Sequence, residues 1–274
     1  MKKAFLFWIS VLSFSLLFLG EHQNVFASGD IKVLGSLTQE KVVGGGESYN
    51  GAIIIKNAGG SPCKVKIYQT DYLFYADGSN SYGLPGSNPL SNAKWVALST
   101  AWVTVPAGQT APVNYSVQVP KNQDLRGTYW SLIMVEPVET AGDNPDVKGK
   151  YVLGLQTSVR YGVQIITDIK DTGTRSIAFL NKKISAENGN KVFQFDIQNT
   201  GERWLNPTVL VQLYNKNGKS LGTFGSEKKR IFPTCSVSHK ILLPDIPKGE
   251  YKAVVIVDNG DQYVFGANYE MIIQ

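Results

Sequence analysis

The chain has 274 residues, of which 43% are hydrophobic and 18% charged, and its formal net charge at pH 7 is +5. Nucleic-acid-binding proteins carry a concentrated basic stripe. Here the positive charge is spread along the sequence, apart from one cluster at residues 228–230 that is predicted to be a solvated turn. Nucleic acid is therefore excluded as a partner. The length suits one large or two ordinary domains, each able to bury a core.

The first 27 residues have the pattern of a secretory signal peptide. Lys2 and Lys3 precede an apolar run over residues 4–19, and Val25-Phe26-Ala27 provides a small-residue cleavage site. Because the apolar run is short for a membrane span, we expect cleavage near Ala27 rather than anchoring. The mature chain is thus expected to have no transmembrane segment and to be periplasmic or secreted.

Short alternating runs separated by turn residues follow, which is typical of all-β sandwiches. In the first part the pattern predicts seven strands, a number that suits one immunoglobulin-like sandwich. Residues 77–92 consist of turn-forming residue types and are predicted to be a mobile surface loop. The seven predicted strands cover residues 31–37, 48–56, 63–75, 95–98, 111–119, 128–136 and 151–166.

A polar segment over residues 168–176 has the composition of a linker, and a second series of strands follows it. Asn-Gly pairs at 217–218 and 259–260 stand between apolar runs, which is a strong hairpin signal. The predicted fold class is therefore all-β, with two immunoglobulin-like sandwich domains in series at 28–170 and 171–274. The second series covers residues 177–184, 191–199, 208–214, 236–243, 251–258 and 263–273.

The sequence offers little catalytic chemistry. His239 is the one histidine after residue 27, and its alternating surroundings predict a surface or half-buried strand position. The glycine-rich stretch at 44–48 lacks the Gly-Lys-Ser/Thr ending of a phosphate loop. Cys63 and Cys235 lie in different predicted domains, so two buried thiols are favoured over a disulfide across the domains. We expect no enzymatic activity, no cofactor and no metal.

The strand predicted over residues 151–166 carries Arg160 within a long apolar run. Tyr151, Leu153 and Leu155 share one side of that strand, and Arg160 lies on the other. In one interpretation it is a sheet edge that pairs with a partner strand, in which main-chain bonds give affinity. In the other it is an interior strand, and Arg160 forms a surface salt bridge.

Four segments resemble the periplasmic pilus chaperones of the chaperone–usher pathway, and one of them, "VPAGQ" at 105–109, is similar to the Pro-Gly turn before that family's fifth strand. "LQTSVRY" at 155–161 is similar to that family's donor strand, in which a Gln-Thr pair precedes a lysine, and Arg160 stands at the lysine position. "SLTQEKVV" at 36–43 is similar to its first strand, with Lys41 in place of an arginine. "IQNTGERWLNPTVLV" at 197–211 is similar to the hairpin that opens its second domain. The chain resembles a divergent member of this family.

The resemblance implies a function and a set of partner-binding residues. Lys41 and Arg160 would anchor the C-terminal carboxylate of a client in the cleft between the domains, and Tyr151, Leu153 and Leu155 would fill the client's groove. The partner would be an exported pilin-like or surface protein subunit, together with an outer-membrane usher.

A second interpretation is a structural or adhesive surface protein of tandem sandwiches. Such a protein would bind peptidoglycan or another surface protein through exposed aromatic residues. Trp95, Trp102 and Tyr82 would then matter more than Arg160.

Overall fold

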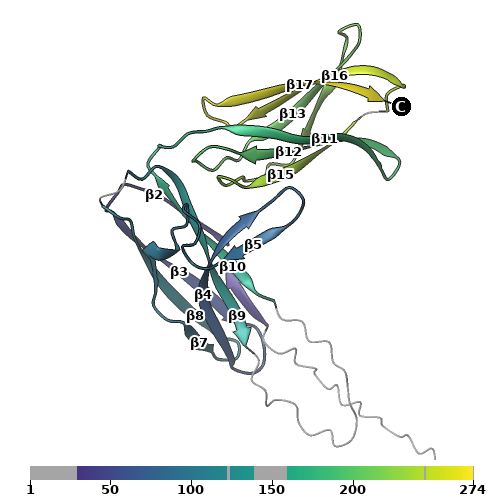
Figure 1. The fold of residues 1–274 in the computed structure, drawn as a ribbon. Coiled ribbons are helices and arrows are strands. Elements are labelled where there is room, and N and C mark those ends of the chain that lie inside the picture. The colour runs from purple at the N-terminus through teal and green to yellow at the C-terminus, as the bar shows by residue number, and fades with distance from the viewer. Residues whose placement is uncertain (1–29, 122–123, 139–158, 244, 274) are drawn as a thin grey trace, which may run out of the picture.

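The computed structural model describes residues 30–121, 124–138, 159–243 and 245–273. These residues form two β-sandwiches joined end to end, each made of two packed sheets (Figure 1). The predicted fold class, all-β with two immunoglobulin-like sandwiches in series, is confirmed. No helix in the described part of the chain is both long and apolar enough to cross a membrane.

The first sandwich pairs a four-stranded sheet with a six-stranded sheet. The smaller sheet has the order β1-β3-β8-β6. The larger has the order β2-β10-β9-β4-β5, and β7 also pairs with β4. The strand bounds are β1 Ile31–Leu34, β2 Thr38–Val43, β3 Ser48–Asn57, β4 Cys63–Phe74, β5 Asn80–Gly83, β6 Val96–Leu98, β7 Trp102–Val105, β8 Thr110–Gln118, β9 Gly127–Val138 and β10 Tyr161–Ile169.

Alternating apolar residues fill the space between these two sheets. Ile53 and Val113 from one sheet and Val65, Ile133 and Val163 from the other are each at most 1% exposed. Side chains alternate across a strand, so this pattern buries one face of each sheet. The odd-numbered residues of β10 thereby face the core of the first sandwich as far as Ile165.

The second sandwich consists of a three-stranded sheet, β11-β12-β15, and a four-stranded sheet, β14-β13-β16-β17. Turns at Asn215–Lys219 and Asn259–Tyr263 close hairpins at the two predicted Asn-Gly pairs, and both glycines adopt the left-handed conformation (φ 76° and 78°). Its strands are β11 Ile177–Glu187, β12 Asn190–Asn199, β13 Thr208–Asn215, β14 Ser220–Ser226, β15 Ser236–Leu242, β16 Gly249–Asp258 and β17 Val264–Ile273.

The strand pattern differs from the prediction in several places. Strands β2, β5, β7 and β14 were not predicted, because each is short or lacks clear alternation. Strand β10 runs to Ile169, two residues into the predicted linker. The predicted signal peptide at 1–27 lies outside the described residues, and the domain boundary at 170/171, which falls between β10 and β11, stays a prediction.

Composition predicts a mobile loop at 77–92, but the structure shows residues 86–91 of this insert held by specific hydrogen bonds. Asp71, which is 3% exposed, accepts hydrogen bonds from the backbone N–H groups of Gly86 (2.9 Å) and Asn88 (2.7 Å) and from the hydroxyls of Ser87 and Ser91. Burial acts to raise the pKa of Asp71, but these hydrogen bonds together outweigh it and hold the pKa below its usual value. One buried carboxylate therefore organises a segment that sequence composition alone suggests is loose.

Two other expectations concern buried residues. His239 is fully buried rather than at the surface, because it faces the core beside Phe195 on the neighbouring strand. Burial lowers its pKa to about 4, and the nearby Lys229 acts in the same direction. Cys63 and Cys235 are both free and buried, as predicted.

Candidate functional site: the edge of strand β10 and the domain junction

Strand β10 lies at the side of its sheet, and only part of its outer edge is covered. The parallel pairing with β2 runs from Gln164 to Ile169, and the first contact is the Gln164 N–H donating to Leu37 (2.8 Å). Residues Tyr161–Val163 pair with β9 on their other side but have no strand partner on the β2 side among the described residues. Because N–H directions alternate along a strand, the Gly162 N–H points the same way as that of Gln164. This short edge is thus open for strand pairing.

Arg160 lies at the start of this open edge. Its side chain is 58% exposed, and its Nη1 lies 3.9 Å from Oε1 of Glu136 on β9. An exposed pair at that separation contributes about 0–1 kcal/mol at most. This is the surface pair that the interior-strand interpretation predicts. The guanidinium nevertheless remains available to another anion, since so weak a pair does not hold it.

Lys41 lies on β2, far from Arg160. The pairing register places Lys41 opposite Thr167, seven residues along β10 from Arg160, which corresponds to ~23 Å. Fully extended lysine and arginine side chains cannot close such a gap around one carboxylate. The anchor predicted from Lys41 and Arg160 together is therefore corrected: the structure does not bring the two cations together. The predicted donor residues Tyr151, Leu153 and Leu155 lie outside the described residues.

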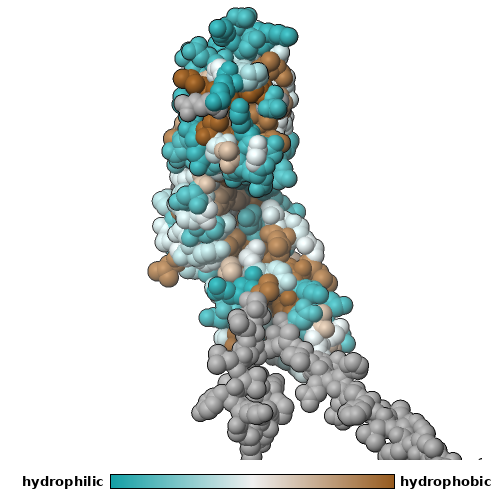
Figure 2. Space-filling view, turned by 90° about the vertical axis from the view of Figure 1, so that its right-hand side faces the viewer, coloured by the Kyte–Doolittle hydropathy of each residue, from teal (hydrophilic) through white to brown (hydrophobic). Residues whose placement is uncertain are grey.

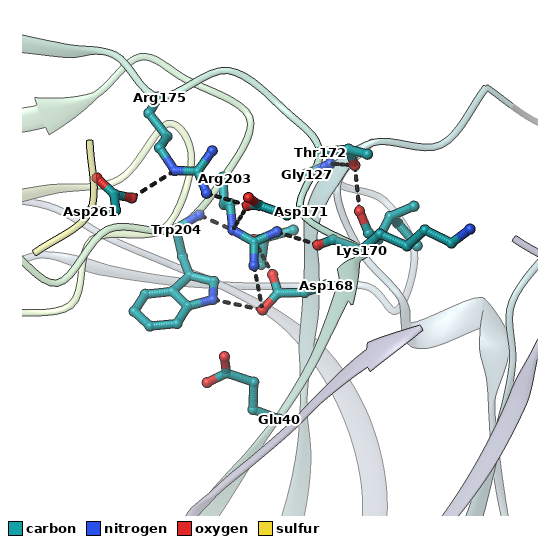
Figure 3. Close-up of polar contacts among 12 residues, drawn as sticks. Glu40, Gly127, Asp168, Lys170, Asp171, Thr172, Arg175, Arg203, Trp204 and Asp261 are labelled. Carbon is teal, nitrogen blue, oxygen red and sulfur yellow. Dashed lines mark hydrogen bonds and ion pairs between the residues drawn. The ribbon is translucent and has the colours of Figure 1, made fainter. Parts of the chain in front are cut away.

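At the opposite end of β10, the junction between the sandwiches is built around Asp168, whose side chain is fully buried (Figure 3). One carboxylate oxygen accepts a hydrogen bond from the Thr128 hydroxyl, and the other accepts one from Trp204 Nε1 at 2.9 Å. Arg203 lies 3.7 Å from the same carboxylate and donates to the Lys170 carbonyl at 2.6 Å. These bonds tie the end of the first sandwich to the start of the second.

A second ion pair crosses the junction beside Trp204. Arg230 Nη1 lies 3.0 Å from Glu40 Oε2, and its guanidinium stacks over the Trp204 ring at 3.9 Å. Burial raises the pKa of Glu40, Asp168 adds to that rise, and attraction to Arg230 opposes it. The cluster at 228–230 is therefore not simply a solvated turn, because Arg230 is held by both an acid and an aromatic ring.

Apolar contacts reinforce these polar ones. Trp130 of the first sandwich stacks on Phe232 of the second, with ring centroids 4.8 Å apart and planes within 9°. Phe74 meets the same Phe232 edge-on at 6.1 Å. Gly127, at φ 72°, passes so close to the second sandwich that a Cβ there would lie 2.1 Å from the Glu202 carbonyl oxygen. The junction is tightly packed, and its geometry leaves no space for a side chain at Gly127.

The arginines at this junction already form ion pairs within the protein. Arg203 and Arg230 each have an acidic partner, so a client carboxylate entering here would compete with Asp168 or Glu40. Sequence reasoning missed this cluster, although "ERW" at 202–204 within the quoted hairpin and "KKR" at 228–230 were the available signals. The open edge of β10 and Arg160 therefore remain the better candidate for partner binding.

Comparisons with known proteins give matches at the level of structure alone. No family model and no curated protein match the sequence. Among solved structures, the class 5 fimbriae chaperone CfaA is 12% identical with a TM-score of 0.46, covering 89% of this chain and 100% of that one. The E. coli chaperone DraB is 15% identical with a TM-score of 0.41, covering 90% and 96%. A PapD-like domain of human CEP192 is 14% identical with a TM-score of 0.32, covering 58% and 97%. Similarity at this level carries no functional argument, so any function rests on the residues of the site.

Proposed function

We propose that this protein is an exported, chaperone-like protein that binds an extended segment of a secreted pilin-like or surface subunit at the edge of β10. The single observation that carries the proposal is the register of β2, which leaves Tyr161–Val163 without a strand partner among the described residues. An incoming strand would form main-chain hydrogen bonds there, each contributing about 0.5–1.5 kcal/mol.

Side chains on both faces of the edge suit such a partner. Val159 is 55% exposed, and Tyr161 and Val163 continue the same face toward the core of the sandwich. The predicted donors Tyr151, Leu153 and Leu155 extend this odd-numbered series upstream and stay predictions. Arg160, on the opposite face, would pair with a client carboxylate through charge-assisted hydrogen bonds, and Lys41 takes no part in that contact. Assembly through an usher stays part of this proposal.

The test uses two substitutions at Gly162, whose N–H points to the open edge. Gly162→Pro removes that N–H and places the proline ring where a partner strand would lie. Gly162→Ala is the matched control, because it introduces the same Cβ, 3.1 Å from Leu132 Cδ1, and keeps the N–H. Each variant is co-expressed with a secreted pilin-like subunit of the same organism, and the complex is measured by affinity purification and native mass spectrometry.

We expect Gly162→Pro to reduce recovery of the complex at least tenfold relative to Gly162→Ala, and Leu153→Asp to abolish it. Equal recovery with the proline and alanine variants would reject strand pairing at this edge. Thermal unfolding of both variants shows whether any loss comes from the fold instead.

One observation favours a second candidate function, binding to the cell wall. Trp102 is 44% exposed, and Lys64 Nζ lies over its ring at 4.6 Å, so one face of β4 and β7 presents an aromatic ring beside a cation. Trp95, by contrast, packs on Tyr129 at 4.6 Å and is half-buried. Sedimentation with purified peptidoglycan tests this candidate: retention that is lost in Trp102→Ala supports it, and no retention rejects it.

A further inference from the structure

A pocket of about 480 Å³ lies where the β4–β5 hairpin of the first sandwich meets the outer face of the β11-β12-β15 sheet. The hairpin tip contributes Tyr75, Ala76 and Asp77, and the Ala76 N–H donates to the Ser236 hydroxyl at 3.0 Å. The space-filling view shows the surface hollowed at the level where the two sandwiches meet (Figure 2). This pocket is remote from the open edge of β10 and plays no part in the function proposed above.

The central feature of the pocket is a buried, incompletely bonded carboxylate. Asp196, in the middle strand of the sheet, is 7% exposed. Its Oδ2 accepts a hydrogen bond from Asn181 Nδ2 at 3.0 Å, whereas its buried Oδ1 has no hydrogen-bond partner among the described residues. An unsatisfied buried acceptor is costly, and most such groups in folded proteins are paired. Asp196 lines the pocket, so a bound donor would satisfy this carboxylate once the side chain turns its unpaired oxygen toward the pocket.

Several of the surrounding residues offer further acceptors. The side-chain amides of Asn181 and Gln194 donate to Asp196 and to Ser238, which turns their carbonyl oxygens toward other contacts. Asp77 adds a second carboxylate, and Lys183 is the one cationic side chain among the residues that line the pocket in the described structure. Asn181 itself has φ 50°, beside a register shift between Leu180 and Lys183. A ligand that fits these residues carries a positive charge and several N–H donors.

We propose that this pocket binds a guanidinium or alkylammonium group. Guanidinium is planar and has five N–H donors, so it can reach Asp196 and a neighbouring carbonyl oxygen together. The group would come from an arginine or lysine side chain of a bound polypeptide, or from a free small amine. Both sources share the same chemistry, and the experiment separates them.

The test titrates the full mature protein with N-acetyl-arginine-N-methylamide and with the citrulline analogue, which has the same shape but no charge. Binding is followed by NMR shifts of the side-chain amides of Asn181 and Gln194. Spermidine and calcium chloride are titrated in parallel. We expect the shifts to saturate with the arginine probe. The citrulline probe should bind at least tenfold more weakly, because a charged hydrogen bond is lost. Tighter binding of spermidine than of the arginine probe would assign the pocket to free amines.

Two variants with opposite expected effects complete the test. Asp196→Asn keeps the shape of the side chain but removes its charge, and it should weaken arginine binding at least tenfold. Lys183→Gln removes the competing cation and should strengthen binding severalfold. Equal binding of the arginine and citrulline probes, a response to calcium alone, or unchanged binding in Asp196→Asn would each overturn the proposal.

Discussion

The two ends of strand β10 have the same neighbour, β9, but opposite surroundings on the other side. From Gln164 to Ile169 the strand is covered by β2 and ends in the junction around the buried Asp168. From Tyr161 to Val163 the outer edge is open in the described part of the chain, and Arg160 beside it is exposed. The two ends of one strand thus differ: one end holds the second sandwich through Asp168, and the other has an unpaired outer edge in the described part of the chain.

The difference shows how a protein can leave a few residues of a strand edge unpaired while a neighbouring strand covers the rest. Long unpaired edges invite aggregation, and proteins usually cover or shorten them. Here β2 covers six residues of β10 and leaves three. A short edge beside a charged residue limits nonspecific pairing, and under the proposed function it would give a client strand a defined place to pair.

The largest expected effect is at the junction. Trp130→Ala removes a side chain that is 1% exposed, stacks on Phe232 and donates to the Tyr72 carbonyl at 2.7 Å. We expect a loss of about 3–5 kcal/mol in the free energy of unfolding, measured by urea denaturation. Trp102→Ala is the matched control, because Trp102 is 44% exposed and should cost well under half as much. Similar losses for the two variants would contradict the description of the junction as a packed core.

The next effect is the pH dependence of the stability of the second sandwich, which forms one side of the junction. Burial lowers the pKa of His239 from 6.5 to about 4 in the folded protein. The unfolded chain therefore binds a proton between these values that the folded protein does not, so stability is fully present above pH 6.5 and falls as the pH approaches 4. The expected loss is about 3 kcal/mol, at 1.36 kcal/mol per pKa unit.

Denaturation of the wild type and of His239→Asn across this range measures the contribution. Asn keeps a polar group near Ser226, which lies 2.7 Å from His239 Nδ1. The variant should be less stable at neutral pH but should lose stability less steeply on acidification. Parallel curves for the two proteins would show that His239 does not titrate in this way.

Local sequence pattern predicted most of the strands but not the residues that join the sandwiches. Alternation and the Asn-Gly turns depend on residues close in sequence, and those predictions hold for β3, β8, β12 and β16. The sequence predicts that Asp168 lies in a polar linker, because residues 168–176 are mostly polar. It is buried in the structure because Thr128 and Trp204, distant in sequence, supply its hydrogen bonds. No local pattern contains that information.

Only part of the candidate site could be predicted from the sequence, again because local patterns do not show which distant strands pair. Arg160 stands out in the sequence as a cation within an apolar run, and in the structure it lies just before β10 with its side chain 58% exposed. Its pairing with Lys41 required the register between β2 and β10, and that register places Lys41 opposite Thr167. A parallel pairing between strands more than a hundred residues apart leaves no signal in either strand alone.

The smallest expected effect on stability is at the open end of β10. Arg160→Ala removes only an exposed pair with Glu136, 3.9 Å away, and should change the free energy of unfolding by less than about 1 kcal/mol. Client capture should nevertheless fall, because the guanidinium would lose its charge-assisted bond to a client carboxylate. Arg160→Lys keeps the positive charge but not the planar guanidinium, so it should retain part of the capture. Lys41→Ala should leave capture unchanged, because Lys41 lies ~23 Å from Arg160 along the strand. If Lys41→Ala and Arg160→Ala reduce capture equally, the client contacts both ends of β10, and the division of the strand into a junction end and a binding end is wrong.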